Sequence, residues 1–126
     1  MRVVIDASAL LALLFNEPGA DMVLELVRGA SLSAVNLDEV LHTCARRGMD
    51  AGAIVSHLAR LELDIRAFDH MQARISAALH PRAQPIGLSF ADRACLALGT
   101  VMQAIVLTAD RDLSTFDAAI DIRLIR

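Results

Sequence analysis

The fold is decided by a short stretch near the start of the chain, Arg2-Val3-Val4-Ile5-Asp6-Ala7-Ser8-Ala9-Leu10. Residues 2–5 are typical of a buried strand, and an acid stands directly after them. The apolar segment 9–15 that follows has the length of a short helix, and Glu17-Pro18-Gly19 ends it. A buried strand that leads through an acidic turn into a helix predicts the start of an α/β fold.

The same alternation continues to the end of the chain. Further strands are expected at 31–35, 63–67, 104–107 and 120–125. Helices are expected at 20–28, from Asn36, from Asp50, at 69–79, from Ser89 and at 112–119. The segment 80–87, with two prolines and a glycine, is expected to be a surface loop. Strands that alternate with helices specify an α/β fold with a mainly parallel sheet.

Length and composition set the broad class of protein. A chain of 126 residues predicts one domain, 1–126, around one core. The apolar run before Asp6 is too short for a signal peptide or a membrane span, so a cytoplasmic protein without membrane contact is expected. Cys44 and Cys95 lack metal-site spacing, which favours buried thiols over a zinc site or a disulfide.

The balance of side chains limits how the protein contacts its partners. A net charge of −3 argues against a large cationic surface for nucleic acid, and four Phe without Trp or Tyr disfavour a base-stacking platform of the kind that grips single strands nonspecifically. All twelve basic residues are Arg, so any phosphate contact would come from guanidinium groups. Hydrophobic residues make up 56% of the chain, which suggests apolar surface covered by a subunit or partner. The segments 10–15 and 22–27 are candidates for it, with plain core packing as the alternative.

Four acids are predicted to meet at one edge of the sheet. Asp6 leaves the first strand and Asp110 leaves the strand at 104–107, whereas Glu39 and Asp92 lie in the first turns of two helices. Right-handed crossovers run each helix antiparallel to the strands, so helix starts and strand exits share an edge. That edge is where open α/β sheets bind their ligands.

Such a cluster needs a cation. Two like charges ~4 Å apart repel by about 4 kcal/mol at an effective dielectric constant of 20. Carboxylates without neighbouring His or Cys suit Mg²⁺ or Mn²⁺, which retain several waters and leave room for a phosphate. An ion of this kind activates water and neutralises charge that develops on phosphorus. The four acids therefore predict hydrolysis of a phosphodiester.

Each acid also has a structural explanation. Glu39 and Asp92 are at positions where acids cap helices, with Asn36 expected as the N-cap before Glu39, and Asp110 suits a turn or a cap. Asp6 is harder to explain in this way, because it caps a helix at best. One metal site explains all four acids by a single cause.

Four motifs, in this order along the chain, carry a resemblance to a known family. They are Asp6-Ala7-Ser8-Ala9-Leu10-Leu11, Asn36-Leu37-Asp38-Glu39-Val40, Leu88-Ser89-Phe90-Ala91-Asp92-Arg93-Ala94 and Leu107-Thr108-Ala109-Asp110-Arg111-Asp112. The chain resembles PIN-domain proteins and, more narrowly, the VapC toxins of bacterial toxin–antitoxin pairs. The resemblance implies a three-layer α/β/α sandwich with a sheet of four to five strands. It also implies an Mg²⁺- or Mn²⁺-dependent endoribonuclease that acts on RNA, a cognate VapB-like antitoxin and a homodimer.

The resemblance also assigns roles to the acids. Asp6, Glu39 and Asp92 match the family's most dependable acids and Asp110 matches its fourth, as catalytic residues of which Asp6, Asp92 and Asp110 would bind the metal. Asp112 is an alternative fourth acid in the same turn.

Neighbouring residues are supporting candidates. Ser8 matches a hydroxyl that helps to hold the water or metal. Asp38 would point about 100° away from Glu39 on a helix, which favours Glu39 as the site residue. Arg93 and Arg111 each follow a site acid, either to contact RNA phosphates or to form ion pairs with the acids.

Other classes of protein fit the sequence less well. A phosphoacceptor receiver domain needs a lysine, and a haloacid-dehalogenase-type phosphatase needs a second Asp where Ser8 stands. No GxGxxG, GxxxxGK or GxSxG motif is present, and the four His are scattered. A noncatalytic PIN-like domain that binds RNA or a protein, with structural acids, remains an open alternative.

Overall fold

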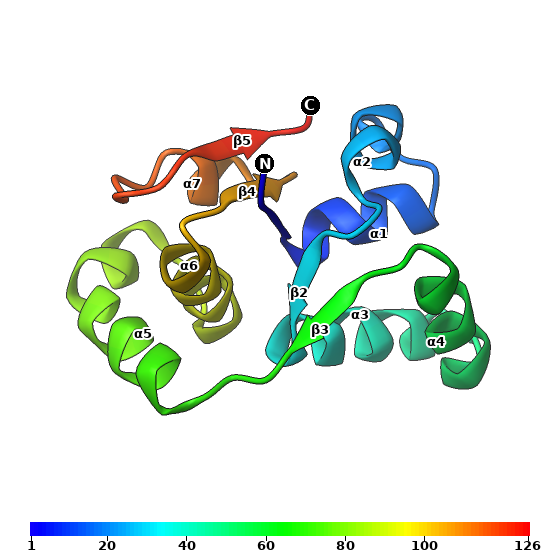
Figure 1. Ribbon diagram of the computed structural model, residues 1–126, viewed down its shortest axis with the longest axis horizontal. Coiled ribbons are helices and arrows are strands. Elements are labelled where there is room, and N and C mark those ends of the chain that lie inside the picture. Colours follow the sequence, from blue (N-terminus) through cyan, green and yellow to red (C-terminus); the bar gives the residue numbers. More distant parts are fainter.

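The computed structural model describes residues 1–126 and contains one five-stranded sheet with every neighbouring pair of strands parallel (Figure 1). The strands are β1 (Val3–Ile5), β2 (Ser31–Ser33), β3 (Asp64–Arg66), β4 (Ile105–Thr108) and β5 (Ile122–Leu124). Their order across the sheet is β3-β2-β1-β4-β5, so the direction of winding reverses between β1 and β4. The predicted α/β fold with a parallel sheet of four to five strands is confirmed.

Helices cover both faces of this sheet (Figure 1). They are α1 (Ala7–Leu14), α2 (Ala20–Leu26), α3 (Ala34–Arg46), α4 (Ala51–Arg60), α5 (His70–Ala83), α6 (Phe90–Met102) and α7 (Arg111–Ser114). The first four share one apolar core with the sheet, whereas α6 packs on the opposite face with α5 outside it. The layers are therefore those of an α/β/α sandwich.

The central strand β1 explains why two cores form. Its residues are β-branched and buried, and successive side chains of a strand point to opposite faces. Val3 and Ile5 lie in the core beneath α1 to α4, whereas Val4 lies with Val106 in the core beneath α6. Asp6, the residue after Ile5, therefore stands at the end of a strand that packs against a core on each face.

Three local predictions were wrong. The N-cap of α3 is Ser33, whose Oγ accepts from the Val35 backbone N–H, and Asn36 lies buried inside that helix. The expected loop at 80–87 is helical through Pro81 to Ala83, because burial of Ala83 against α6 and α7 holds the last turn in place. The helix expected at 112–119 has only four residues, Arg111–Ser114.

The apolar segments proposed as partner surface mainly form core. Leu10 and Ala12 are fully buried in α1, as are Val23 and Val27 in and after α2, and most of their neighbours pack against the same cluster. Leu24 is the exception, with 60% of its surface exposed. Both cysteines are buried free thiols, as predicted. None of the helices has the length and apolar character that crossing a bilayer requires.

Candidate active site

Asp6 is a buried acid at the carboxyl end of the central strand, 3% exposed. It occupies the N-cap position of α1 but makes no side-chain capping bond. Its Oδ2 instead accepts hydrogen bonds from Ser8 Oγ at 2.6 Å and Thr108 Oγ1 at 2.8 Å. Helix capping therefore does not explain why an acid stands here.

The environment of Asp6 makes its ionisation costly. Burial raises its pKa to about 6, against the opposing effect of the hydrogen bonds from Ser8 and Thr108. The negative charges of Asp92 and Glu39 raise the pKa further. A carboxyl group that is difficult to ionise on its own is a natural ligand for a cation.

The hydroxyls of Ser8 and Thr108 also accept hydrogen bonds from the backbone where the chain leaves β4. Ser8 Oγ accepts from the Ala109 backbone N–H at 2.9 Å, and Thr108 Oγ1 accepts from the Asp110 N–H at 3.0 Å. The turns after β1 and β4 are thereby joined at the point where the winding reverses. Ser8 was expected at the site, but Thr108 was missed; its position two residues before Asp110, at the end of a buried strand, was the available signal.

Glu39 reaches the site from the first turns of α3, and Asn36 positions it. Asn36 Nδ2 donates to Glu39 Oε1 at 3.0 Å and to the carbonyl of Ala91, in α6, at 3.1 Å. Asn36 is fully buried, so this amide fixes α3 against α6. The predicted N-cap role of Asn36 is wrong, and one of its two partners, Ala91, lies 55 positions away in the sequence. Asp38 is exposed, as its helical angle predicted.

The pKa of Glu39 is raised, mainly by burial, while the hydrogen bond from Asn36 lowers it. Asp92 and then Asp38 contribute further upward shifts. Glu39 makes no capping bond, because Ser33 caps the helix. Helix capping, the structural explanation that the sequence suggested, is therefore wrong for Glu39 as it is for Asp6.

Asp92 does have a structural role. It forms a capping box with Ser89: the Ser89 N–H donates to Asp92 Oδ2 at 2.8 Å, and the Asp92 N–H donates to Ser89 Oγ at 3.2 Å. Its pKa is nevertheless raised, first by partial burial and then by the charges of Asp110 and Asp112, against both hydrogen bonds. The capping box accounts for one carboxylate oxygen and leaves Oδ1 available.

The turn after β4 presents two further acids. Asp110 caps α7 by accepting from the Asp112 N–H at 2.9 Å, so its predicted capping role is confirmed. Asp110 is half-buried and Asp112 is exposed. Both charges act on Asp92, with that of Asp110 the larger.

The acids converge without a protein cation between them. Cys95, fully buried beneath the site, has a thiol whose pKa is raised well above its ordinary value by burial and then by Asp6, Asp92 and Glu39. None of these acids forms a salt bridge; the four salt bridges of the molecule involve other carboxylates. No arginine of the protein therefore offsets the repulsion between these negative charges.

The two arginines next to site acids behave differently from each other. Arg93 Nη1 donates to the carbonyl and hydroxyl of Ser76, at 2.9 and 3.3 Å, so its guanidinium is held against α5. Arg111 is exposed in the first position of α7. Neither forms an ion pair with an acid, so that alternative from the sequence is wrong.

The acids fit a hydrated divalent ion better than an all-protein metal cage. No group of three or more His, Cys, Asp or Glu side chains is arranged to hold a metal ion by itself. Mg²⁺ is commonly bound by one or two carboxylates, with waters and substrate phosphates completing its shell. The all-oxygen donors and the uncompensated charge suit this mode of binding.

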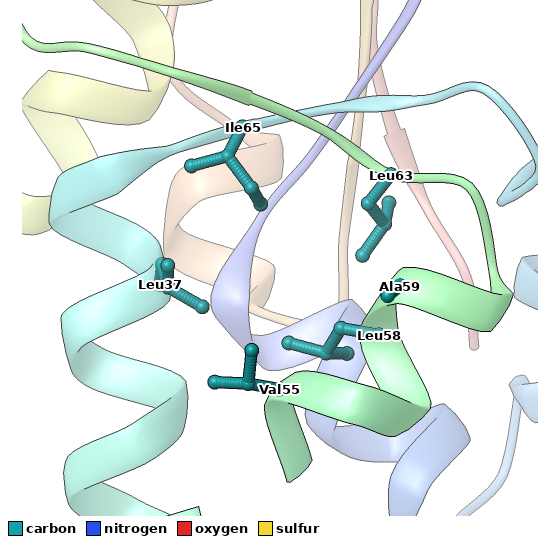
Figure 2. A pocket seen from close by; sticks show the side chains of 6 residues that line it. All are labelled: Leu37, Val55, Leu58, Ala59, Leu63 and Ile65. Carbon is teal, nitrogen blue, oxygen red and sulfur yellow. The ribbon is translucent and has the colours of Figure 1, made fainter. Parts of the chain in front are cut away.

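A separate apolar hollow lies between α3, α4 and β3 (Figure 2). Figure 2 shows its six side chains around a shared space: Leu37, Val55, Leu58, Ala59, Leu63 and Ile65. None of these residues carries a polar side chain, so the hollow supplies no acid, base or ligand. The hollow is therefore not part of the candidate site at the carboxyl edge of the sheet.

Comparison with known families agrees with this geometry. Residues 3–119 match the family described as PIN domain. The chain belongs to the PIN domain family. The matched region contains every acid of the candidate site. No curated protein matches this PIN domain significantly.

Solved structures share its fold at low sequence identity. A chain of a toxin–antitoxin complex from Klebsiella pneumoniae has a TM-score of 0.80 and 16% identity, and the match covers 100% of this chain and 98% of that one. A chain of DNA-bound VapBC from Salmonella typhimurium gives 0.74 and 13%, with 100% and 99% covered. VapC20 from Mycobacterium tuberculosis, described as a sarcin–ricin loop cleaving toxin, gives 0.70 and 18%, with 89% and 92% covered.

Proposed function

We propose that this PIN domain is a metal-dependent endoribonuclease that hydrolyses RNA phosphodiester bonds, and that it is the toxin of a VapBC-type toxin–antitoxin pair. The observation that carries the proposal is Asp6, buried at the winding reversal among further acids and without a protein cation. The shared fold of VapBC chains and of a toxin that cleaves RNA supports it.

The metal would be Mg²⁺ or Mn²⁺, placed among Asp6, Asp92 and Asp110, with one or two of these carboxylates bound directly and the rest through waters of its shell. When bound, it would supply an activated water and neutralise charge on the phosphate. Asp6 Oδ1, Asp92 Oδ1 and Asp110 Oδ2 accept no hydrogen bond within the protein. Asp110 is preferred to Asp112 because it is half-buried and acts more strongly on Asp92.

Four further residues would act around the reacting phosphate: Glu39, Ser8, Arg93 and Arg111. Glu39, with a raised pKa and with Oε1 fixed by Asn36, is suited to accept a proton from an attacking water. Ser8 holds the orientation of Asp6. Arg111 is free to contact an RNA phosphate, whereas Arg93 is engaged with Ser76 and acts on substrate only from the edge of the site.

The test is cleavage of RNA by the purified chain. With Mn²⁺ present, the wild type should cleave single-stranded RNA and Asp6→Asn should cleave at least about 100-fold more slowly, since even outer-shell changes cost metal sites 10- to 100-fold. Asp50→Asn is the matched control, because Asp50 caps α4 outside the acid cluster. Sequencing RNA ends after brief induction in cells would identify the substrate. Equal cleavage by wild type and Asp6→Asn would favour the noncatalytic alternative.

The partner would be a small VapB-like antitoxin, and the toxin itself would form a homodimer. Co-expression with a small protein encoded beside this chain should yield a stable complex in which cleavage is suppressed. Light scattering of the free chain would give its oligomeric state. A chain that remains active in the presence of that neighbour would contradict the toxin role but not the nuclease.

A further inference from the structure

An exposed aromatic residue stands at the edge of the sheet where the acids lie. Phe90 is the first residue of α6, and 49% of its surface is exposed. Asp92 is two positions further along the same turn, about 3 Å along the helix axis. Phe68 follows the end of β3 at the same edge of the sheet, and its ring centroid lies 5.4 Å from that of Phe90 at an interplanar angle of 88°.

The ring of Phe90 is held in place. Phe68 contacts it in an edge-on arrangement, and the Arg93 guanidinium carbon lies 5.7 Å from its centroid. That guanidinium is itself fixed by Ser76 on α5. Three elements thus position an aromatic ring that remains half in water. The ring is therefore both accessible and held in one orientation.

Nucleobases of single strands stack on exposed aromatic rings, with contributions from neighbouring arginines. On the helix the side chains of Phe90 and Asp92 point about 160° apart, so the ring lies to one side of the acids at the same edge of the sheet. Single-stranded RNA that crosses this edge can place the base of a flanking nucleotide on that side. We propose that Phe90, with Phe68 and Arg93, forms a stacking subsite for one base of single-stranded RNA next to the cleaved bond. This inference rests on the proposed ribonuclease function and adds a single-base subsite to it. It differs from an extended stacking platform, for which the chain has too few aromatic residues.

The experiment separates the base from the backbone of the ligand. The probes are a fluorescein-labelled single-stranded hexamer of adenylate and the same hexamer with abasic riboses. Binding is measured by anisotropy with Mg²⁺, in a Glu39→Gln background to slow cleavage. Phe90→Leu keeps the apolar bulk without the π face, and Phe90→Trp enlarges that face. Val101→Ala, at the exposed far end of α6, is the matched control.

Phe90→Leu should raise the dissociation constant for the adenylate hexamer by about 5- to 150-fold and leave that of the abasic hexamer within about 2-fold. Phe90→Trp should bind the adenylate hexamer at least as tightly as the parent, and Val101→Ala should match the parent. Equal changes for both probes, or none, would overturn the subsite. So would a loss of binding that follows a change in oligomeric state by light scattering, because Phe90 would then be a subunit contact.

The two levels of the proposal fail in different ways. If the wild type cleaves RNA in an Asp6-dependent manner and Phe90→Leu cleaves and binds equally well, only the subsite is wrong. If the wild type neither binds nor cleaves any RNA, the ribonuclease itself is wrong.

Discussion

The two ends of the same parallel sheet treat charge in opposite ways. At the amino end, Arg28 is paired with Glu62 at 2.8 Å and Arg66 with Asp64 at 2.6 Å, all of them well exposed. Arg2, Arg28 and Asp64 line a polar hollow at the starts of β1, β2 and β3. Arg66, the last residue of β3, also lines it, because its side chain reaches back to Asp64. At the carboxyl end the acids are partly or fully buried and have no cationic partner. Exposed charges in pairs cost little, whereas crowded buried charges are kept only at the expense of stability.

This contrast is the physical reason for assigning the candidate site to the carboxyl end of the sheet. The backbone of a parallel sheet is equivalent at its two ends apart from direction, so the fold alone does not require acids at one of them. The winding reverses between β1 and β4, and open α/β sheets bind their ligands at the carboxyl end of such a reversal, which is where the costly charges lie. If the two ends differ in this way, removing a charge at the carboxyl end should change stability more than removing one at the amino end.

The largest effect should be a pH dependence of stability that comes from Asp6. Its pKa is about 6 in the folded state against 3.8 ordinarily, so the folded protein retains this proton over a wider pH range than the unfolded chain. The free energy of unfolding should therefore fall as pH rises from about 4 to about 6, by about 3 kcal/mol, and stay low above that. Urea unfolding in EDTA from about pH 3.5 to pH 8 measures it.

Two variants isolate this effect from other titrating groups. Asp6→Asn should lack that share of the pH dependence and be more stable than wild type at pH 8. Asp64→Asn, at the amino end, should retain the wild-type slope because its carboxylate is exposed and paired. A wild-type slope in Asp6→Asn would show that Asp6 is not the strained group.

Binding of a divalent ion should give the next largest effect. Mn²⁺ at 100 times its dissociation constant should stabilise the folded chain by about 2.7 kcal/mol, since only the folded state assembles the acids. Asp6→Asn should lose most of that gain, and Asp50→Asn should retain it. Thermal unfolding with and without Mn²⁺ provides the measurement. Equal stabilisation of all three chains would place the ion elsewhere.

Thr108 allows a finer test of how the carboxyl end is built. Thr108→Val keeps the shape but removes the donor to Asp6 and the acceptor for the Asp110 N–H, which should cost about 1–3 kcal/mol. Because that hydrogen bond lowers the pKa of Asp6, the midpoint of the pH dependence should move upward in the variant. Thr100→Val is the control, since its exposed hydroxyl bonds only to a helix carbonyl. Unchanged stability in Thr108→Val would show that Ser8 alone suffices.

The sequence predicted the sheet, its parallel pairing and the edge at which the acids meet, because these follow from local patterns and the handedness of crossovers. It could not predict which acids have structural roles. Asp92 and Asp110 cap helices as well as facing the site, whereas Asp6 and Glu39 do not. For Glu39 the reason is that β2 ends at Ser33, and the Ser33 side chain caps α3 in place of a residue nearer to Glu39.

Contacts between distant segments were also beyond the sequence. The amide of Asn36 joins α3 to Ala91, 55 positions away, and Thr108 reaches Asp6 across 102 positions. The local pattern places Thr108 at the end of a buried strand and Asn36 near a helix start, but it does not show which distant group either side chain contacts. The helix through Pro81 shows the same limit, since burial of Ala83 outweighs the local preference for a loop.

The smallest effect should come from the amino end of the sheet. Arg66→Gln removes the ion pair with Asp64, in which both side chains are 49% exposed, and should change the free energy of unfolding by no more than about 1 kcal/mol. Such a loss should shrink further in 1 M salt, because exposed charges are screened over about 3 Å there. Urea unfolding at low and high salt measures both quantities. A loss of several kcal/mol that persists in high salt would mean that paired arginines at this end support the fold as strongly as the acids strain it, and the contrast between the two ends would not hold.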